Sequence, residues 1–296
     1  MRHPNVVRTF DCDQLVVDGA PRCFLVMEYV EGRSLRALLT DLERIPETLL
    51  RELALQIAAG LMAIHAAGIV HRDLKPENVL ITTEHEVRIM DLGVARLQEA
   101  SIALTKEGQF AGSIRYAAPE QFGEEGVGPA ADLYALGVML HELATGRNPF
   151  VRDDTAGEIQ AQLHHVPPRL CDLETETSRF FSEVVSKLLA KRAEDRFASS
   201  EALHEVLAEA ERSAWWQARA VELRAGEEHR PRLRVRRETT LRGRKADLEA
   251  LAAAWERARA GEGGTLFLEG EAGIGKTRLL AEFLDGPEGR FVTWFR

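Results

Sequence analysis

A polar motif beside two short apolar runs places the strongest constraint on the fold of this chain. Residues 71–78 read His-Arg-Asp-Leu-Lys-Pro-Glu-Asn, and Asp-Leu-Gly follows at 91–93. The residues between the two motifs form two β-forming apolar runs around a polar turn, which predicts a hairpin. The ends of such a hairpin would hold Asn78 and Asp91 side by side, where two oxygen ligands can bind magnesium.

The polar residues of these motifs are those that metal-assisted phosphoryl transfer requires. The reaction needs a carboxylate that orients and deprotonates a hydroxyl, oxygen ligands for magnesium, and a cation that balances the charge of the moving phosphate. Asp73 can supply the carboxylate and Lys75 the cation, while Asn78 and Asp91 can supply the ligands. The alternative interpretation is a charged surface loop before a buried strand.

The order of these residues is that of protein-kinase catalytic and magnesium loops. From its start to about residue 210 the chain resembles a bacterial, eukaryotic-type serine/threonine protein kinase. The resemblance implies an α+β protein-kinase-like fold with a mainly α-helical large lobe and a partial small lobe. It also implies ATP and Mg²⁺ as cofactors and protein substrates that carry Ser or Thr, because tyrosine kinases usually differ at Lys75.

The resemblance also assigns structural residues outside the hairpin. These are His71, Arg72, Glu120, Asp132 and Arg196. Glu120 would pair with Arg196, and Asp132 would cap the backbone of the catalytic loop. Surface Glu–Arg pairs are common and contribute little, so the joint occurrence of these residues in the family order supports the assignment.

The segment that ends at 111–120 resembles a kinase activation loop. Ser113 lies where its hydroxyl could bond to the catalytic aspartate and lysine. A regulatory phosphate is expected on Thr105 before Ser101, with Arg72 as the residue that binds it. The alternative is an ordinary polar loop.

The first thirty residues resemble a remnant of the kinase small lobe. They begin like the turn that follows the αC helix, and two strands are expected at roughly 6–12 and 23–28, before a hinge. The expected ATP-binding residues are Met27, Glu28, Val30 and Leu80. Met27 resembles the gatekeeper, and the backbone of Glu28 and Val30 would hold adenine.

In a complete kinase of this family, a glycine-rich loop, a strand lysine and a glutamate of the αC helix that pairs with this lysine precede the point at which this chain begins. None of them is found in residues 1–70, which contain no lysine. We expect a start codon placed too far downstream, although a genuine remnant is the alternative. The chain on its own is expected to transfer little phosphate, since charges preorganised at the phosphates supply about 10²–10³-fold per donor. The alternative function is a pseudokinase scaffold whose nucleotide signal comes from a second module.

That second module is indicated by a glycine-rich motif at 270–277, which fits G-x-x-x-x-G-K-[ST]. An apolar run at 265–269 predicts a strand before the motif, and 278–284 predicts a helix after it. The expected P-loop residues are Gly270, Gly273, Gly275, Lys276 and Thr277, with Lys276 at the phosphates and Thr277 on magnesium. Residues 241–251 resemble the lead-in of AAA-like (STAND-type) signalling ATPases, which implies a second ATP site at the start of an α/β P-loop domain. The alternative is a glycine-rich turn with a stray lysine.

The expected organisation follows from these motifs. It comprises a small-lobe remnant and hinge at 1–30, a kinase large lobe at 31–212, a helical and basic linker at 213–240 and the start of a P-loop ATPase domain at 241–296. A long helix is predicted over 201–225. A net charge of −9 argues against nucleic acid as a partner. No run of eighteen apolar residues and no signal peptide is found, so no membrane segment and a cytoplasmic location are expected.

Overall fold

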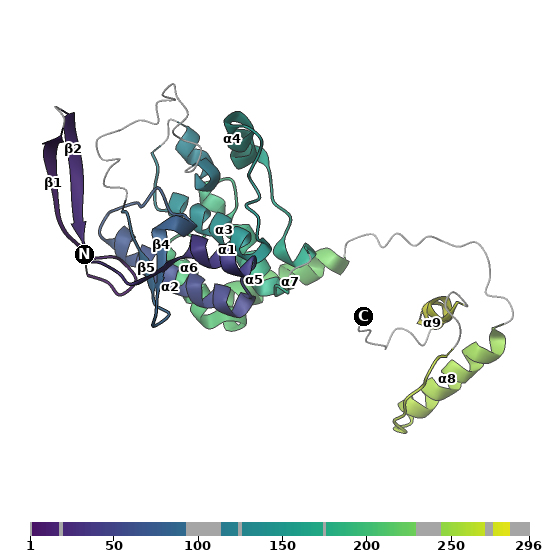
Figure 1. The fold of residues 1–296 in the computed structure, drawn as a ribbon. Helices are drawn as coiled ribbons and strands as arrows, with labels where there is room; N and C mark the ends of the chain where they lie inside the picture. Colours follow the sequence, from purple (N-terminus) through teal and green to yellow (C-terminus); the bar gives the residue numbers. More distant parts are fainter. Residues whose placement is uncertain are drawn as a thin grey trace. The chain divides into compact units, whose positions relative to one another are not determined.

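The computed structural model describes residues 2–17, 20–92, 114–123, 126–173, 176–228, 244–269 and 275–284. The chain divides into two compact units, Met1–Glu228 and His229–Arg296 (Figure 1). The first unit therefore contains the first half of the segment 213–240 that the sequence assigns to a linker. The domain boundaries given above stay predictions.

Two small antiparallel sheets belong to the first unit. Strand β1 (Thr9–Val17) pairs with β2 (Ala20–Met27), and β3 (Gly32–Ser34), β4 (Val79–Thr82) and β5 (Val87–Ile89) form the second sheet in that order. The β4–β5 pair is the hairpin predicted around the polar motif, with Val79 opposite Ile89.

The first strand begins later than the sequence suggested, because residues 5–7 are bonded to the second sheet instead. Val7 donates its N–H to the carbonyl of Ile89 (2.8 Å), and Ile89 donates to the carbonyl of Asn5 (2.9 Å). The Asn5 side chain donates to the carbonyl of Val87 (3.1 Å). Gly60 permits this close approach, since a Cβ there would lie 2.9 Å from the Asn5 carbonyl oxygen. The N-terminal segment is thereby tied to the large lobe.

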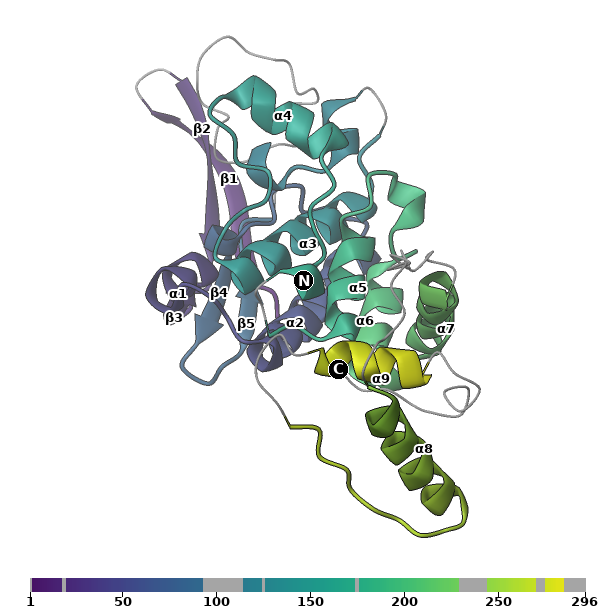
Figure 2. The same cartoon turned by 90° about the vertical axis from the view of Figure 1, so that its right-hand side faces the viewer.

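Helices make up most of the first unit. They are α1 (Leu35–Leu42), α2 (Glu47–Ala66), α3 (Ala130–Thr145), α4 (Thr155–His164), α5 (Arg179–Leu188), α6 (Ser200–Glu209) and α7 (Ala214–Glu228). Every residue of α3 from Ala131 to Ala144 is buried. A helix that is buried all round lies in the centre of a fold, and Figure 2 shows α3 in the middle of the other helices.

Among the described residues, α2 is the one helix long and apolar enough to cross a membrane. Its buried residues, including Leu53, Ile57 and Leu61, belong to the same hydrophobic core as those of α3 and α6. The apolar composition of α2 is therefore accounted for by its packing inside the large lobe.

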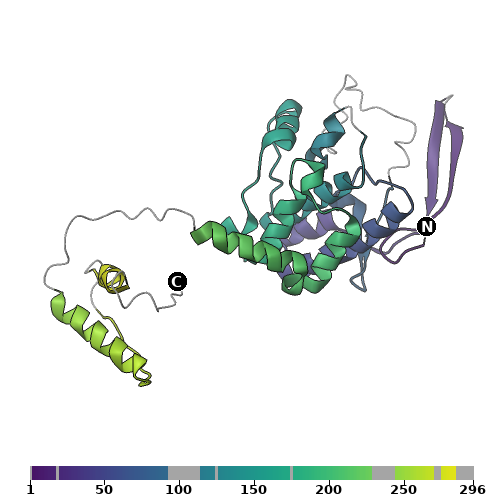
Figure 3. The same ribbon diagram turned by 180° about the vertical axis from the view of Figure 1, so that it is seen from behind.

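The predicted helix over 201–225 is broken into two. Helix α6 ends at Glu209, Ala210 takes a φ of 52°, and the hydroxyl of Ser213 accepts from the N–H of Trp216 (3.3 Å) at the start of α7. The break allows Trp215 to pack on Phe197, with ring centroids 5.3 Å apart. Trp216 packs edge-on against Phe180 at 5.5 Å. Burial of two indoles favours the break over a continuous helix, and α7, green in Figure 3, is the last helix of the first unit.

Replacing Trp215 by alanine should therefore destabilise the first unit. Trp215 is partly buried, so we expect a loss of about 2–3 kcal/mol, below the ~3–5 kcal/mol of a fully buried aromatic residue. Urea unfolding of the 296-residue chain, followed by circular dichroism, measures the change. Val221→Ala on the same helix is the control, because Val221 is 63% exposed and should contribute little. Equal effects of the two substitutions would contradict the packing role of Trp215.

The described part of the second unit contains helices α8 (Lys245–Arg259) and α9 (Lys276–Leu284). Helix α9 begins two residues before the predicted helix 278–284. The strand predicted at 265–269 is not formed, and Phe267 is 82% exposed. A strand needs a neighbour that pairs with its backbone, and no described residue of this unit provides one.

Candidate active site

The catalytic loop leaves the end of α2 and enters β4. Within it, Lys75 Nζ donates to Asp73 Oδ2 (2.8 Å), and Asn78 Nδ2 donates to the Asp73 carbonyl oxygen (2.9 Å) and to Oδ2 (3.3 Å). The side chains of Asp73 and Lys75 are 24% and 21% exposed. The structure therefore brings together three residues predicted from the motif, with the Asp73 carboxylate held in one orientation at a partly open site.

The backbone of this loop is held by the buried carboxylate of Asp132 on α3. Asp132 accepts from the N–H groups of His71 and Arg72, each at 2.8 Å, as the predicted cap requires. Two further residues complete the support: His65 Nε2 lies 2.8 Å from Asp132 Oδ2, and His65 Nδ1 lies 3.1 Å from Ser200 Oγ. The sequence did not reveal the role of Ser200, because no local motif marks it.

The catalytic and magnesium loops are bonded to each other through Met90. The ring of the buried His71 lies with Nε2 2.9 Å from the Met90 carbonyl oxygen, and Met90 donates its N–H to the carbonyl of Asn78 (2.9 Å). Asp91 follows at once, with a left-handed φ of 58°. Such a conformation costs a non-glycine residue about 1–3 kcal/mol, and it is held here by the bonded hairpin. Asn78 and Asp91 thus lie at neighbouring ends of the two strands, as predicted.

The oxygen donors at these strand ends fit magnesium. Because Asn78 uses its Nδ2 on Asp73, its carboxamide oxygen is the atom that can bind a cation, and Asp91 is exposed. Within the part of the chain that the structure describes, no group of three or more His, Cys, Asp or Glu could hold a metal ion. Magnesium commonly takes one or two protein ligands beside water and substrate phosphates. The site therefore suits an ion that arrives with a nucleotide.

The predicted ATP-binding residues lie on β2, the hinge and β4. Met27 ends β2 and pairs with Thr9, and Leu80 is on the central strand of the second sheet. The N–H of Glu28 donates to the carbonyl of Arg8 (2.9 Å). This N–H is therefore used within the protein, which leaves the carbonyl oxygen as the backbone group of Glu28 available for the predicted contact with adenine. Val30 is partly buried in the hinge.

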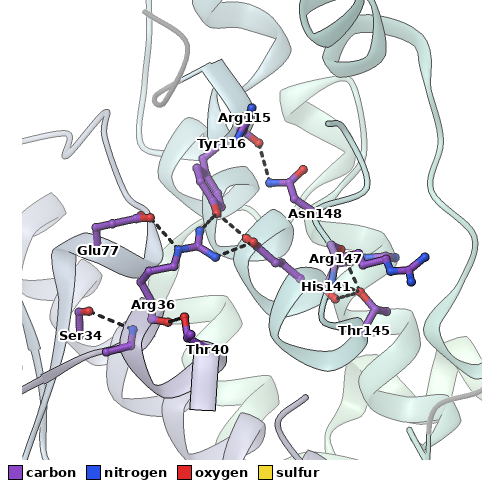
Figure 4. A network of polar contacts seen from close by, with 12 residues as sticks. Ser34, Arg36, Thr40, Glu77, Arg115, Tyr116, His141, Thr145, Arg147 and Asn148 are labelled. Atoms are coloured by element: carbon purple, nitrogen blue, oxygen red, sulfur yellow. Dashed lines mark hydrogen bonds and ion pairs between the residues drawn. The ribbon is translucent and has the colours of Figure 1, made fainter. Parts of the chain in front are cut away.

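A cluster around Arg36 joins the catalytic loop to the segment that precedes Glu120. Arg36 on α1 donates to Glu77 (2.7 Å) and to the hydroxyl of Tyr116 (Figure 4). Arg36 also donates to Glu142 on α3 (2.8 Å), which accepts from the Tyr116 hydroxyl as well. Burial, and then the Glu142 carboxylate, raises the pKa of Tyr116, so the phenol stays a donor. No motif in the sequence marks this cluster, because its members come from four separate segments.

Glu120 and Arg196 form the predicted ion pair, but they are not a surface pair. The Arg196 side chain is fully buried, and both of its terminal nitrogens donate to Glu120, at 2.6 and 2.8 Å. The remaining guanidinium N–H groups donate to the carbonyls of Ala130, Ala190 and Lys191. All five donors of the guanidinium are therefore satisfied.

Several predicted residues are not tested by the structure. Ser101, Thr105, Ser113, Gly270 and Gly273 lie outside the described residues, as does the side chain of Thr277. Arg72 is exposed. Gly275 takes a φ of 98°, which favours glycine, and α9 begins with Lys276 directly after it.

A helical domain whose loop presents an aspartate, a lysine and an asparagine beside a second aspartate has the architecture of a protein-kinase large lobe. Residues 1–207 match the protein kinase domain family, and the chain belongs to that family. Residues 240–296 match the AAA ATPase domain family. Both resemblances inferred from the sequence are thereby confirmed.

Relatives of the kinase part come from several bacteria. The chain is 38% identical over 201 residues to a serine/threonine-protein kinase of Corynebacterium efficiens, covering 67% of this chain and 38% of that protein. It is 36% identical over 209 residues to the kinase Pkn1 of Myxococcus xanthus, covering 69% and 29%. It is 31% identical over 197 residues to the kinase PknB of Mycobacterium leprae, covering 67% and 32%. The chain thus spans about a third of the length of these relatives.

Proposed function

We propose that the first unit transfers the γ-phosphate of ATP to Ser or Thr hydroxyls of proteins, in bacterial signalling within the cytoplasm. The observation that carries the proposal is the Asp73 carboxylate, held by Lys75 and Asn78 at the strand ends that also present Asp91. The names of the relatives support Ser and Thr as acceptors.

Each residue of the site has a part in this reaction. Asp73 orients the acceptor hydroxyl and accepts its proton, and Lys75 balances negative charge beside it. Asn78 and Asp91 would hold magnesium, which neutralises charge on the phosphates when bound. The carbonyl of Glu28 and the backbone of Val30 would hold adenine, with Met27 and Leu80 against the base.

For the second unit we propose a second ATP site, which couples an ATPase module to the kinase. The match to the AAA ATPase domain supports it, and so does the left-handed Gly275 directly before Lys276 at the start of α9. Anions are favoured at such a helix N-terminus. Lys276 would contact the phosphates and Thr277 would bind magnesium.

The proposal is tested with the longest in-frame gene product that contains residues 1–296, radiolabelled ATP and a generic basic protein substrate. We expect labelled Ser or Thr, and the label should persist in a Lys276→Ala variant, because that substitution affects only the second site. Residues 1–296 on their own should label the substrate far more weakly. They contain no lysine before Lys75 and so lack the strand lysine that holds the phosphates of ATP in this family. Nucleotide binding without any transfer would instead support the pseudokinase scaffold.

A further inference from the structure

A buried carboxamide on α4 holds the backbone that follows the activation loop. Gln162 is fully buried, and its Nε2 donates to the carbonyls of Arg115 (2.7 Å) and Ile114 (3.2 Å). Its Oε1 accepts from the hydroxyl of Tyr134 on α3 (2.7 Å). The carboxamide thus connects a short segment near the catalytic loop to the central helix of the lobe.

The direction of these bonds is set by Lys191. Its Nζ donates to the hydroxyl of Tyr134 (3.0 Å) and to the carbonyl of Gln162 (2.7 Å), and it lies 4.4 Å from the centre of the Phe150 ring. An ammonium group has donors and no acceptor, so the hydroxyl of Tyr134 accepts from Lys191 and donates to Gln162 Oε1. The amide nitrogen of Gln162 is therefore the group that faces the two carbonyls.

Other contacts hold the same segment, Ile114–Tyr116, from different sides. The carbonyl of Arg115 also accepts from Asn148 Nδ2 (3.2 Å) (Figure 4). Arg115 Nε donates to the buried Glu158 of α4 (2.8 Å). Ile114 and Tyr116 are each 5% exposed. The conformation of the segment is therefore determined by the helices around it.

We propose that Gln162 is a positioning residue for the polypeptide substrate, an inference that rests on the proposed kinase function. The segment that it fixes leads to Ala118 and Gln121, and Gln121 Nε2 donates to the carbonyl of Arg72 (3.3 Å), the residue before Asp73. A polypeptide that brings its hydroxyl to Asp73 would therefore lie beside this segment.

Without the carboxamide, and among the described residues, the Arg115 carbonyl would keep only Asn148 as a donor and the Ile114 carbonyl only the N–H of Ala117. Loss of two buried hydrogen bonds is costly, so the segment should be free to move. Binding of the polypeptide should then weaken, whereas ATP lies at the hinge and should bind as before.

The test compares Gln162→Leu with the unchanged protein, as the longest in-frame gene product. Leucine fills a similar volume without a donor. We expect the KM for a Ser-containing peptide to rise roughly tenfold, which corresponds to about 1.4 kcal/mol, with the KM for ATP and kinase-dependent ATP hydrolysis unchanged. Gln160→Leu is the matched control, because Gln160 is exposed on the same helix and its replacement should change neither constant.

Hydrogen exchange gives a second readout that needs no catalysis. The N–H of Ala117 donates to the carbonyl of Ile114 (3.1 Å), so exchange at 114–118 should accelerate in Gln162→Leu and stay unchanged elsewhere in the unit. Tyr134→Phe removes the hydroxyl that orients the amide, and its effect on the peptide KM should be less than additive with that of Gln162→Leu.

Two results would overturn the proposal. One is an unchanged peptide KM, whether or not exchange at 114–118 becomes faster. The other is a loss of ATP affinity with faster exchange throughout the unit, which would show a general structural role. If the unchanged protein showed no Asp73-dependent transfer, the proposed function itself would fail, and the substrate role with it, whatever the exchange showed.

Discussion

Asp73→Asn should abolish phosphate transfer and leave nucleotide affinity close to that of the unchanged protein. The carboxylate faces the hydroxyl, and positioned proton acceptors contribute about 10²–10⁴-fold to such reactions. Asparagine keeps an oxygen that can accept from Lys75, which lies 2.8 Å from Asp73, so the loop should keep its shape. Initial rates with radiolabelled ATP and fluorescence titration of a nucleotide analogue measure the two effects.

Asp91→Asn is the comparison that separates the roles of the two carboxylates. Asp91 is exposed at the end of the hairpin, where it would be a magnesium ligand, so its replacement should weaken binding of the magnesium nucleotide as well as turnover. Raising the magnesium concentration should restore part of the activity of Asp91→Asn and none of that of Asp73→Asn. If both variants bound nucleotide like the unchanged protein, this division of roles would be wrong.

Arg196→Met should be the most destabilising single substitution proposed in the first unit. It leaves Glu120 without its cation and removes one donor from each of three backbone carbonyls. Breaking a buried pair by removing one partner typically costs about 3–5 kcal/mol. Urea unfolding of the 296-residue chain measures the loss.

A neighbouring arginine provides the control for this prediction. Arg192 pairs with Glu194 on the surface, with side chains 73% and 61% exposed, so Arg192→Met should cost less than about 1 kcal/mol. Replacing both members of the buried pair, as Glu120→Leu with Arg196→Met, should cost less than the sum of the two single changes. A loss in Arg196→Met no larger than in Arg192→Met would contradict the role of burial.

The features that the sequence determined are local ones. The hairpin β4–β5 and the placement of Asn78 beside Asp91 involve residues that are close along the chain. Alternating apolar residues, a polar turn and motif spacing carry that information directly. The helix that begins at Lys276, after Gly275, is local in the same sense.

Elements that depend on distant partners were predicted less well. The single helix over 201–225 breaks because its two indoles pack on rings from α5 and the segment before α6. The strand at 265–269 is not formed, because a strand requires a neighbour that pairs with its backbone. Propensity and periodicity describe one segment at a time and do not report on its partners.

Only the tertiary structure decided how the site is supported. Ser200 reaches His65 across 135 positions of sequence, and Arg36 reaches Glu142 across 106. Gln162 meets Arg115 across 47. The sequence marked Glu120 and Arg196 as partners, but it is burial that makes the loss of either one costly. That burial arises when α3 and the helices around it pack together. In an extended chain, the side chains of Gln162 and Ser200 could bond to many groups. Once the helices pack, their partners are the groups that lie within hydrogen-bonding distance.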